Sequence, residues 1–209
     1  MILPIGNNCY VAEALRDLNI RKCAYPFDWL GIGDYTKFVD FIILILNTTD
    51  IEEFFTKFFT IDNNSTFTME YENDSILHFK NEEFNITFPH DTMDGIIDKH
   101  VRRIKRFVDD FNTSEKIIFV YAGRWDTETD ALLKLMDYVV SINKNVKLLA
   151  INGFPPNTKT PDNIISYNID YKKENVEHSW EWDQINYKQL LINIFKLEQS
   201  NLTSNEIKN

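Results

Sequence analysis

The stretch IIFVYAGRWDTETDALLKLMDYVVSINKNVKLLAINGF, residues 117–154, decides the fold. It begins with the apolar run Ile117 to Tyr121 and ends with a second one, Val146 to Ile151. Between the two runs, the residues from Glu128 to Val140 place apolar side chains at helical spacing. Strands that are apolar throughout and alternate with amphipathic helices predict a parallel sheet covered on both faces. We therefore expect a three-layer α/β fold with a mostly parallel sheet.

Segments on both sides of this stretch continue the alternation of strand and helix. Met1 to Ile5 is predicted to be a strand, and Val11, Ala12 and Leu15 follow it at helical spacing. On the C-terminal side we expect a strand over Ile164 to Ile169 and a closing helix over Tyr187 to Leu197. Further helices are predicted through Phe38, Phe41, Ile42 and Ile45 with Asp34 as cap, over Ile51 to Phe59, and over Ile96 to Val108.

Between residues 66 and 90 the pattern changes to the two-residue period of strands. Phe67, Met69 and Tyr71 alternate with polar residues, and Asn73-Asp74 and Asn81-Glu82 are turn signals. This pattern predicts an antiparallel meander inserted into the main fold. We expect one α/β domain over residues 1–200, followed by a flexible tail over residues 201–209.

The charge balance limits the classes of partner. The chain has 22 Lys and Arg against 32 Asp and Glu, a net charge of −10. Such a charge repels nucleic acid and anionic membrane surfaces. The longest apolar run, Phe41 to Leu46, is too short to cross a bilayer. We expect a small-molecule, peptide or glycan substrate and neither nucleic acid nor membrane as partner, and the sequence does not indicate an oligomeric state.

Cysteine usage and the N-terminus point to the cytoplasm. Cys9 and Cys23 are too few for a disulfide framework, and Met1 to Cys9 does not resemble a signal peptide. Abundant Ile, Asn and Lys suggest an AT-rich genome, such as that of a large DNA virus or an AT-rich bacterium. If the protein is viral, we expect it in the cytoplasm of the host cell. No histidine spacing matches a metal site, and the chain has neither a phosphate-binding glycine fingerprint nor a Walker lysine. We therefore expect no metal and no cofactor.

Three predicted turns lie where strands of the parallel sheet end. They are Gly6 to Cys9, Gly123 to Asp126, and Asn152 to Phe154. In open α/β sheets, ligands bind beyond the carboxyl ends of the strands. The sequence therefore predicts the functional site at these turns.

Cys9 is the candidate nucleophile from its position alone. It lies at the predicted junction of the first strand and the first helix, where backbone amides and the helix dipole favour a thiolate. Asn7 or Asn8 could add an amide donor for an oxyanion. The alternative is that Cys9 only fills a tight turn. Cys23 has no such context.

His90 is the candidate general base because it lies at the end of the meander, before the next helix. It could instead only bond a carbonyl group. Its neighbour Asp91 points the other way on an extended chain, so Asp28, Asn152 or Asp126 could orient the imidazole in its place.

Several aromatic side chains lie next to charged ones. Asp28-Trp29 and Arg124-Trp125 suit the binding of a sugar or peptide, in which a ring stacks and a charge fixes polar groups. Trp180 to Trp182 is better explained by ordinary packing. Arg102, Arg103 and Arg106 form a basic helix face, which is either ion-paired or a site for a phosphate-bearing ligand.

Six short segments share an order along the chain: Ile5 to Cys9, the helix around Arg16, Tyr25 to Trp29, Phe88 to Asp91, Arg102 to Ile104, and Ile117 to Tyr121. Together they resemble the putative papain-like cysteine peptidase family, a domain of unknown function found in bacteria and large DNA viruses. The resemblance extends to about residue 155, and Phe27-Asp28-Trp29 with its upstream cysteine is its most specific part. By the family's name, it implies Cys9 as nucleophile, His90 as base and Asp91 as a third member.

Three hypotheses about function remain open. In the first, the protein is a cysteine-dependent hydrolase or acyl transferase in which Cys9 attacks a carbonyl, His90 moves the proton and Asn8 helps to hold the oxyanion. In the second, it is a carbohydrate-active or nucleotide-sugar-binding protein, Asp28, Trp29 and Arg124 line the ligand cleft, and Cys9 is structural. The third is a non-catalytic interaction module.

Overall fold

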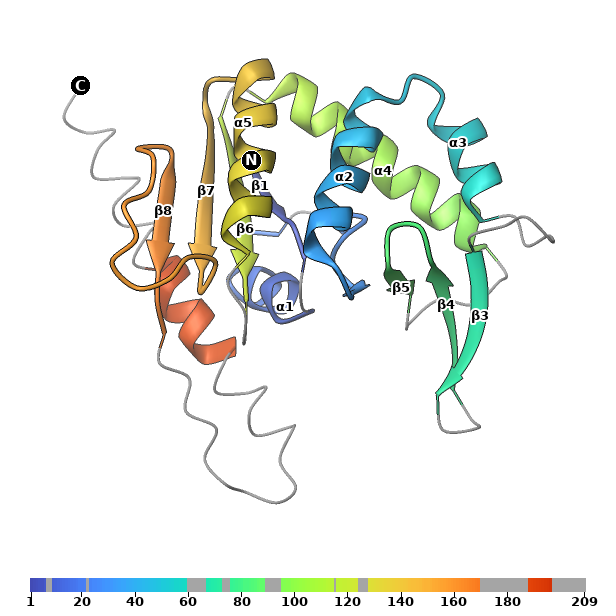
Figure 1. Ribbon diagram of the computed structural model, residues 1–209, viewed down its shortest axis with the longest axis horizontal. Helices are drawn as coiled ribbons and strands as arrows, with labels where there is room; N and C mark the ends of the chain where they lie inside the picture. The colour runs from blue at the N-terminus through green and yellow to red at the C-terminus, as the bar shows by residue number, and fades with distance from the viewer. Residues whose placement is uncertain are drawn as a thin grey trace.

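A computed structural model gives the structure of the 209-residue chain and describes residues 1–6, 9–21, 23–59, 67–72, 76–88, 95–114, 116–123, 128–169 and 188–196. Its central sheet has the strand order β1-β6-β7-β8, and all neighbouring strands in it are parallel (Figure 1). The strands are β1 (Ile2–Pro4), β6 (Ile117–Ala122), β7 (Val146–Ile151) and β8 (Ile164–Tyr167). The predicted α/β fold with a parallel sheet is confirmed.

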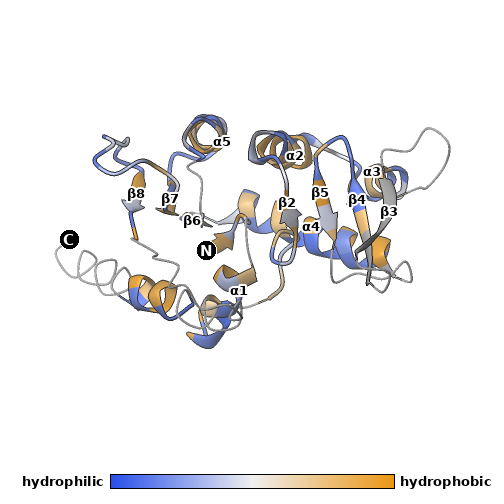
Figure 2. Cartoon of the chain, turned by 60° about the horizontal axis from the view of Figure 1, so that its bottom comes forward, coloured by the Kyte–Doolittle hydropathy of each residue, from blue (hydrophilic) through white to orange (hydrophobic). Residues whose placement is uncertain are grey.

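Helices cover both faces of this sheet. On one face lie α2 (Tyr35–Asn47) and α5 (Thr129–Ile142), and on the other lies α1 (Cys9–Asp17) (Figure 2). Residues 188–196 are helical and bury Leu191 and Phe195 on the α1 side. Successive residues of a strand point to opposite faces, so Phe119 and Tyr121 join the α2 side while Val120 and Ala122 join the α1 side. The three predicted layers are therefore present.

A second, antiparallel sheet lies beside the first and has the strand order β2-β5-β4-β3. Three of its strands, β3 (Phe67–Glu72), β4 (Ile76–Asn81) and β5 (Ile86–Phe88), form the predicted meander. The fourth, β2 (Gly31–Ile32), lies where the sequence pattern predicts no strand. Two residues carry no periodicity, and β2 exists because it pairs with β5, Gly31 opposite Thr87.

Aspartate residues cap the N-termini of two helices on the α2 side. Asp34 is the N-cap of α2, where its side chain accepts a hydrogen bond from the Lys37 amide at 3.1 Å, as predicted. Asp50 caps α3 (Ile51–Phe58) in the same way. These side chains satisfy amides that have no partner within the helix.

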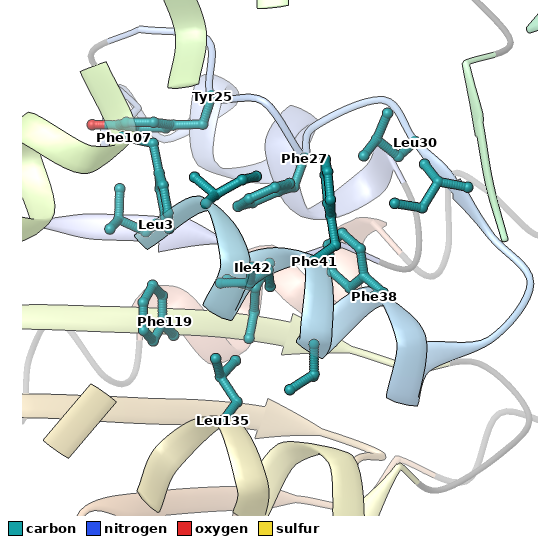
Figure 3. Packing of buried hydrophobic residues seen from close by; sticks show 14 of the residues in the cluster. Leu3, Tyr25, Phe27, Leu30, Phe38, Phe41, Ile42, Phe107, Phe119 and Leu135 are labelled. Carbon is teal, nitrogen blue, oxygen red and sulfur yellow. The ribbon is translucent and has the colours of Figure 1, made fainter. Parts of the chain in front are cut away.

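Aromatic residues fill the space between the central sheet, α2 and α4 (Ile96–Thr113). Figure 3 shows Phe27 among them, and its ring is edge-on to Phe38 at 5.2 Å and to Phe107 at 5.0 Å. Phe27 belongs to the segment between α1 and α2, so this contact fixes that segment against α4. None of the helices in the described part of the chain is long and apolar enough to cross a membrane.

Candidate functional site

The two strands β1 and β6 are neighbours, but the chain leaves them toward opposite faces of the sheet. After β1 it continues into α1 on one face, and after β6 it continues into α5 on the other. Where the connections of adjacent parallel strands diverge in this way, a crevice opens beyond the carboxyl ends of the strands, and ligands of α/β proteins bind there. The candidate site is therefore the carboxyl edge of β1 and β6.

Three helices begin at this edge. Cys9 is the first residue of α1, and Tyr35, the first residue of α2, donates its hydroxyl hydrogen to the carbonyl oxygen of Ile5 at 2.7 Å. At the start of α5, the amide of Glu128 donates to the carbonyl oxygen of Gly153 at 3.2 Å. Because helix N-termini carry a partial positive charge, the edge favours a negatively charged group.

Cys9 is half-buried and is a thiol, like Cys23, rather than half of a disulfide. The first turn of α1 contains no acidic residue, so no carboxylate of that turn opposes a negative charge on sulfur. The predicted position of Cys9, at the junction of the first strand and the first helix, is observed. Its role as nucleophile stays a prediction.

Gly6 directs the chain from β1 toward Cys9. Its φ of +91° is a backbone conformation that favours glycine. A Cβ atom at this position would lie 2.6 Å from Cδ1 of Ile32 and 3.2 Å from the ring of Phe38. The backbone of Gly6 is therefore in close contact with β2 and α2, and its positive φ disfavours any residue with a side chain.

Two tyrosines underlie the edge. The rings of Tyr35 and Tyr121 are edge-on at 5.0 Å, and both side chains are buried. A Cβ atom on Gly123 would lie 2.6 Å from the Tyr121 hydroxyl, and one on Gly153 would lie 3.1 Å from its ring. Burial raises the pKa of Tyr35, and Tyr121 and Glu128 act in the same direction, so its hydroxyl stays protonated. Periodicity does not reveal this pair, although a tyrosine in the otherwise apolar run before Gly123 is a signal for it.

Asn152 follows β7 and has a structural role at the same edge. It adopts a φ of +54°, and its side-chain oxygen accepts a hydrogen bond from the Ile169 amide at 2.7 Å. Its own amide donates to the carbonyl oxygen of Tyr167 at 2.8 Å. These bonds tie the end of β8 to the end of β7.

Asp28 forms a buried ion pair with Arg21, and its carboxylate also accepts a hydrogen bond from the Tyr25 amide at 2.8 Å. The Asp28 side chain is 0% exposed. Burial raises the pKa of Asp28, while Arg21 and the Tyr25 amide oppose this shift. Arg21 is bonded through its amide to Leu15, so the pair is anchored near the C-terminal end of α1, whereas Cys9 begins that helix.

The other predicted site residues divide into two groups. Trp29 is half-buried next to Asp28. Asn8, His90, Asp91 and Arg124 lie outside the described residues, as does Asp126. Substrate contact by Asp28 and Trp29 and catalysis by His90 and Asp91 stay predictions.

The basic face of α4 lines a groove of about 640 Å³ between α3 and α4. In it Lys105 pairs with Glu52 at 3.0 Å, and Arg106 donates to the carbonyl oxygen of Ala24 at 2.9 Å. Four carboxylates share the lining with the cations: Glu52, Asp98, Asp109 and Asp110. The groove is thus better described as an ion-paired face than as a phosphate site. Within the described residues, no group of three or more His, Cys, Asp and Glu side chains is arranged to hold a metal ion.

The fold and the edge define a three-layer α/β protein with a thiol at the crevice between two parallel strands. Residues 1–152 match the putative papain-like cysteine peptidase family, and the chain belongs to this family. It is also 23% identical to an uncharacterized protein of Acanthamoeba polyphaga mimivirus, over 92% of this chain and 97% of that protein. No solved structure matches the chain.

Proposed function

We propose that the protein is a cysteine-dependent hydrolase or acyl transferase with Cys9 as its nucleophile. The observation that carries this proposal is the position of Cys9, the first residue of α1 at the crevice between β1 and β6. Helix N-termini favour the thiolate, which is the reactive form of cysteine. Membership in a family named for cysteine peptidases supports the same assignment.

The proposed reaction has two steps. The Cys9 thiolate attacks a substrate carbonyl, and the tetrahedral oxyanion collapses to a thioester while the leaving group takes a proton from His90. Water, or another acyl acceptor, then attacks the thioester while His90 takes its proton, which releases the acid or acylated product and restores both the thiolate and the protonated His90. Asn8 and the first amides of α1 hold the oxyanion, and Asp91 is proposed as the third member of the catalytic group, as the family name implies. The proposed substrate contacts are Asn8, Trp29 and Arg124. Asp28, whose side chain is fully buried, is proposed to act only by holding the adjacent Trp29 in place.

The pairing of β2 with β5 supports His90 as the partner of Cys9. Cδ1 of Ile32 in β2 packs against Gly6, three residues before Cys9. β5 pairs with β2 and ends at Phe88, two residues before His90. The chain that leads to His90 thus starts from a sheet that touches the segment leading to Cys9. Both cysteines are free thiols, which fits a reducing compartment, so we propose a cytoplasmic location.

The test compares the two cysteines. In the folded protein at neutral pH, we expect iodoacetamide to alkylate Cys9 much faster than Cys23, as measured by peptide mass spectrometry. Activity against a panel of peptide and ester substrates should disappear in Cys9→Ser and persist in Cys23→Ser. His90→Ala should lose activity while keeping the native fold. Equal, slow alkylation of both cysteines, or an active Cys9→Ser variant, would falsify the proposal.

A second candidate function rests on the three helix N-termini at the edge. Their combined dipoles favour the diphosphate of a nucleotide sugar as well as a thiolate. In that case Cys9→Ser keeps its ligand, and thermal unfolding shifts upward with nucleotide sugars in wild type and variant alike.

A further inference from the structure

We propose that Tyr35 is a positioning residue for the segment that leads to Cys9, an inference that rests on the function proposed above. Tyr35 is the first residue of α2 and is 4% exposed. Its hydroxyl donates to the carbonyl oxygen of Ile5 at 2.7 Å. Ile5 lies four residues before Cys9, at the point where the chain leaves the sheet. The hydroxyl therefore acts on Cys9 through the backbone.

Ile5 is held from two sides. Its amide donates to the carbonyl oxygen of Val120 at 3.0 Å, which extends the pairing of β1 with β6 by one residue. Its carbonyl oxygen is held by Tyr35 from the α2 side. Ile5 is fully buried, so this carbonyl has no access to solvent if the Tyr35 hydroxyl is removed. A buried carbonyl without a partner is costly, and the backbone is expected to shift toward a new one.

The packing of the Tyr35 ring fixes the position of its hydroxyl in the native protein. Its ring is edge-on to Tyr121 at 5.0 Å and tilted against Phe38 at 5.3 Å. The ring of Phe38 also lies against Gly6, the next residue toward Cys9. One rigid aromatic group thus fixes both Ile5 and Gly6, and with them the start of α1 relative to β6.

Tyr25 provides a matched control. It is also buried, at 2% exposure, and its hydroxyl donates to a carboxylate oxygen of Asp110 at 2.6 Å. The same hydroxyl lies 3.2 Å from the sulfur of Met1, which precedes β1 at the opposite, amino edge of the sheet. Tyr25→Phe therefore removes a comparable hydrogen bond without touching the segment that leads to Cys9.

The experiment measures the rate of Cys9 alkylation by iodoacetamide against pH in the full chain, in wild type, Tyr35→Phe and Tyr25→Phe. We expect Tyr35→Phe to lower the rate at neutral pH about tenfold and to move the midpoint of the pH profile upward, because a displaced start of α1 stabilises the thiolate less. Tyr25→Phe should stay within about twofold of wild type. With an active substrate, Tyr35→Phe should lower kcat more than it changes KM.

An unchanged pH profile in Tyr35→Phe, or the same loss in both variants, overturns the positioning role and leaves the proposed function intact. Slow alkylation of Cys9 in the wild type overturns the proposed function instead. If Tyr35→Phe does not fold, Ile32→Val tests whether the packing of the Ile5–Gly6 segment sets the reactivity of Cys9, because it removes the Cδ1 atom that lies against Gly6. We expect this variant to slow the alkylation of Cys9 several-fold, and an unchanged rate contradicts the inference.

Discussion

At the scale of single residues, the buried pair of Asp28 and Arg21 is the strongest polar constraint on the segment between α1 and α2. Burial raises the pKa of Asp28, so the partners of the carboxylate, rather than water, keep it charged. The Arg21 side chain is 10% exposed and has little access to solvent. Each member of the pair therefore depends on the other.

We predict that Asp28→Asn destabilises the protein by about 3 kcal/mol, because it leaves the Arg21 guanidinium buried without a counterion. Asp34→Asn is the control, six residues further along the chain, and should leave stability nearly unchanged because asparagine caps helices as well as aspartate does. Chemical denaturation of both variants measures the difference. Equal stabilities for the two variants would show that Asp28 is an ordinary loop residue.

The pKa values of two buried tyrosines determine how the stability of the protein should change at alkaline pH. Burial raises the pKa of Tyr25, with Asp110 and Cys23 adding to the shift, and burial likewise raises the pKa of Tyr35. In the unfolded chain both phenols ionise near pH 10, at about their ordinary pKa. Above that pH the unfolded chain releases protons that the folded chain retains, so stability should fall as pH rises.

Tyrosinate absorbance and denaturation curves recorded against pH test this prediction. Tyr25 and Tyr35 should ionise only when the protein unfolds, and Tyr25→Phe and Tyr35→Phe should each reduce the loss of stability above pH 10. Normal titration of all tyrosines in the folded state argues against it.

At the scale of elements, apolar contacts hold the helix of residues 188–196 on the sheet. Leu191 is fully buried and Phe195 is 4% exposed, in the cluster that also contains Val120 and Leu149. The polar link is Lys188, which pairs with Asp17 at 2.6 Å and Glu13 at 3.8 Å in α1. These partners are partly exposed, so solvent weakens the attraction.

We therefore expect Leu191→Ala to cost about 2 to 5 kcal/mol of unfolding free energy, the range for a buried leucine. Lys188→Ala should lower the unfolding free energy by only a small part of the loss expected for Leu191→Ala. The two variants are compared by urea denaturation, and a larger loss in Lys188→Ala would mean that ion pairs, not burial, attach this helix.

Most helices and strands can be predicted from the pattern of apolar residues and helix caps along the chain. Continuous apolar runs identify β6 and β7, and Asp34 marks the start of α2. β2 carries no such signal, since its two residues form a strand only through tertiary pairing with β5. The burial of His100 is likewise not predictable from local sequence. Its ring is buried against the rings of Phe59 and Phe88, and only the assembled core places it there.

The candidate site is predictable in part. The position of Cys9 follows from an apolar strand, a glycine turn and a helical pattern, all of which are local. The role of Tyr35 depends on a residue 30 positions away, and the role of Arg21 depends on a residue seven positions away in a segment without regular periodicity. Side chains that act across elements cannot be found from periodicity, which reports only which face is buried.

At the scale of the whole molecule, the parallel sheet separates two apolar clusters, one on the α2 side and one on the α1 side. The second cluster combines residues from β6, β7, α1 and the helix of residues 188–196. The part of the chain that matches the family ends at residue 152, before β8 and that helix. The parallel sheet is therefore completed and covered by residues that follow the part of the chain matched to the family.

We predict that a fragment of residues 1–152 binds a hydrophobic dye and aggregates, while the full chain does not. Its loss of Leu191 and Phe195 uncovers Val120, Leu149 and Ile151, and its loss of β8 leaves β7 as an unpaired edge. Dye fluorescence and size-exclusion chromatography test this. A monomeric fragment with cooperative unfolding contradicts it.

The other edge of the parallel sheet is β1, and its sequence explains why the sheet stops there. The carbonyl of Met1 and the amide of Ile5 bond to β6, so the backbone groups of Ile2 and Pro4 point away from the sheet. Pro4 has no amide hydrogen, and it is buried. A strand from a second molecule thus finds no hydrogen-bond donor at Pro4 and cannot continue the ladder of hydrogen bonds. The proline therefore protects this three-residue edge strand against pairing with a strand of another molecule.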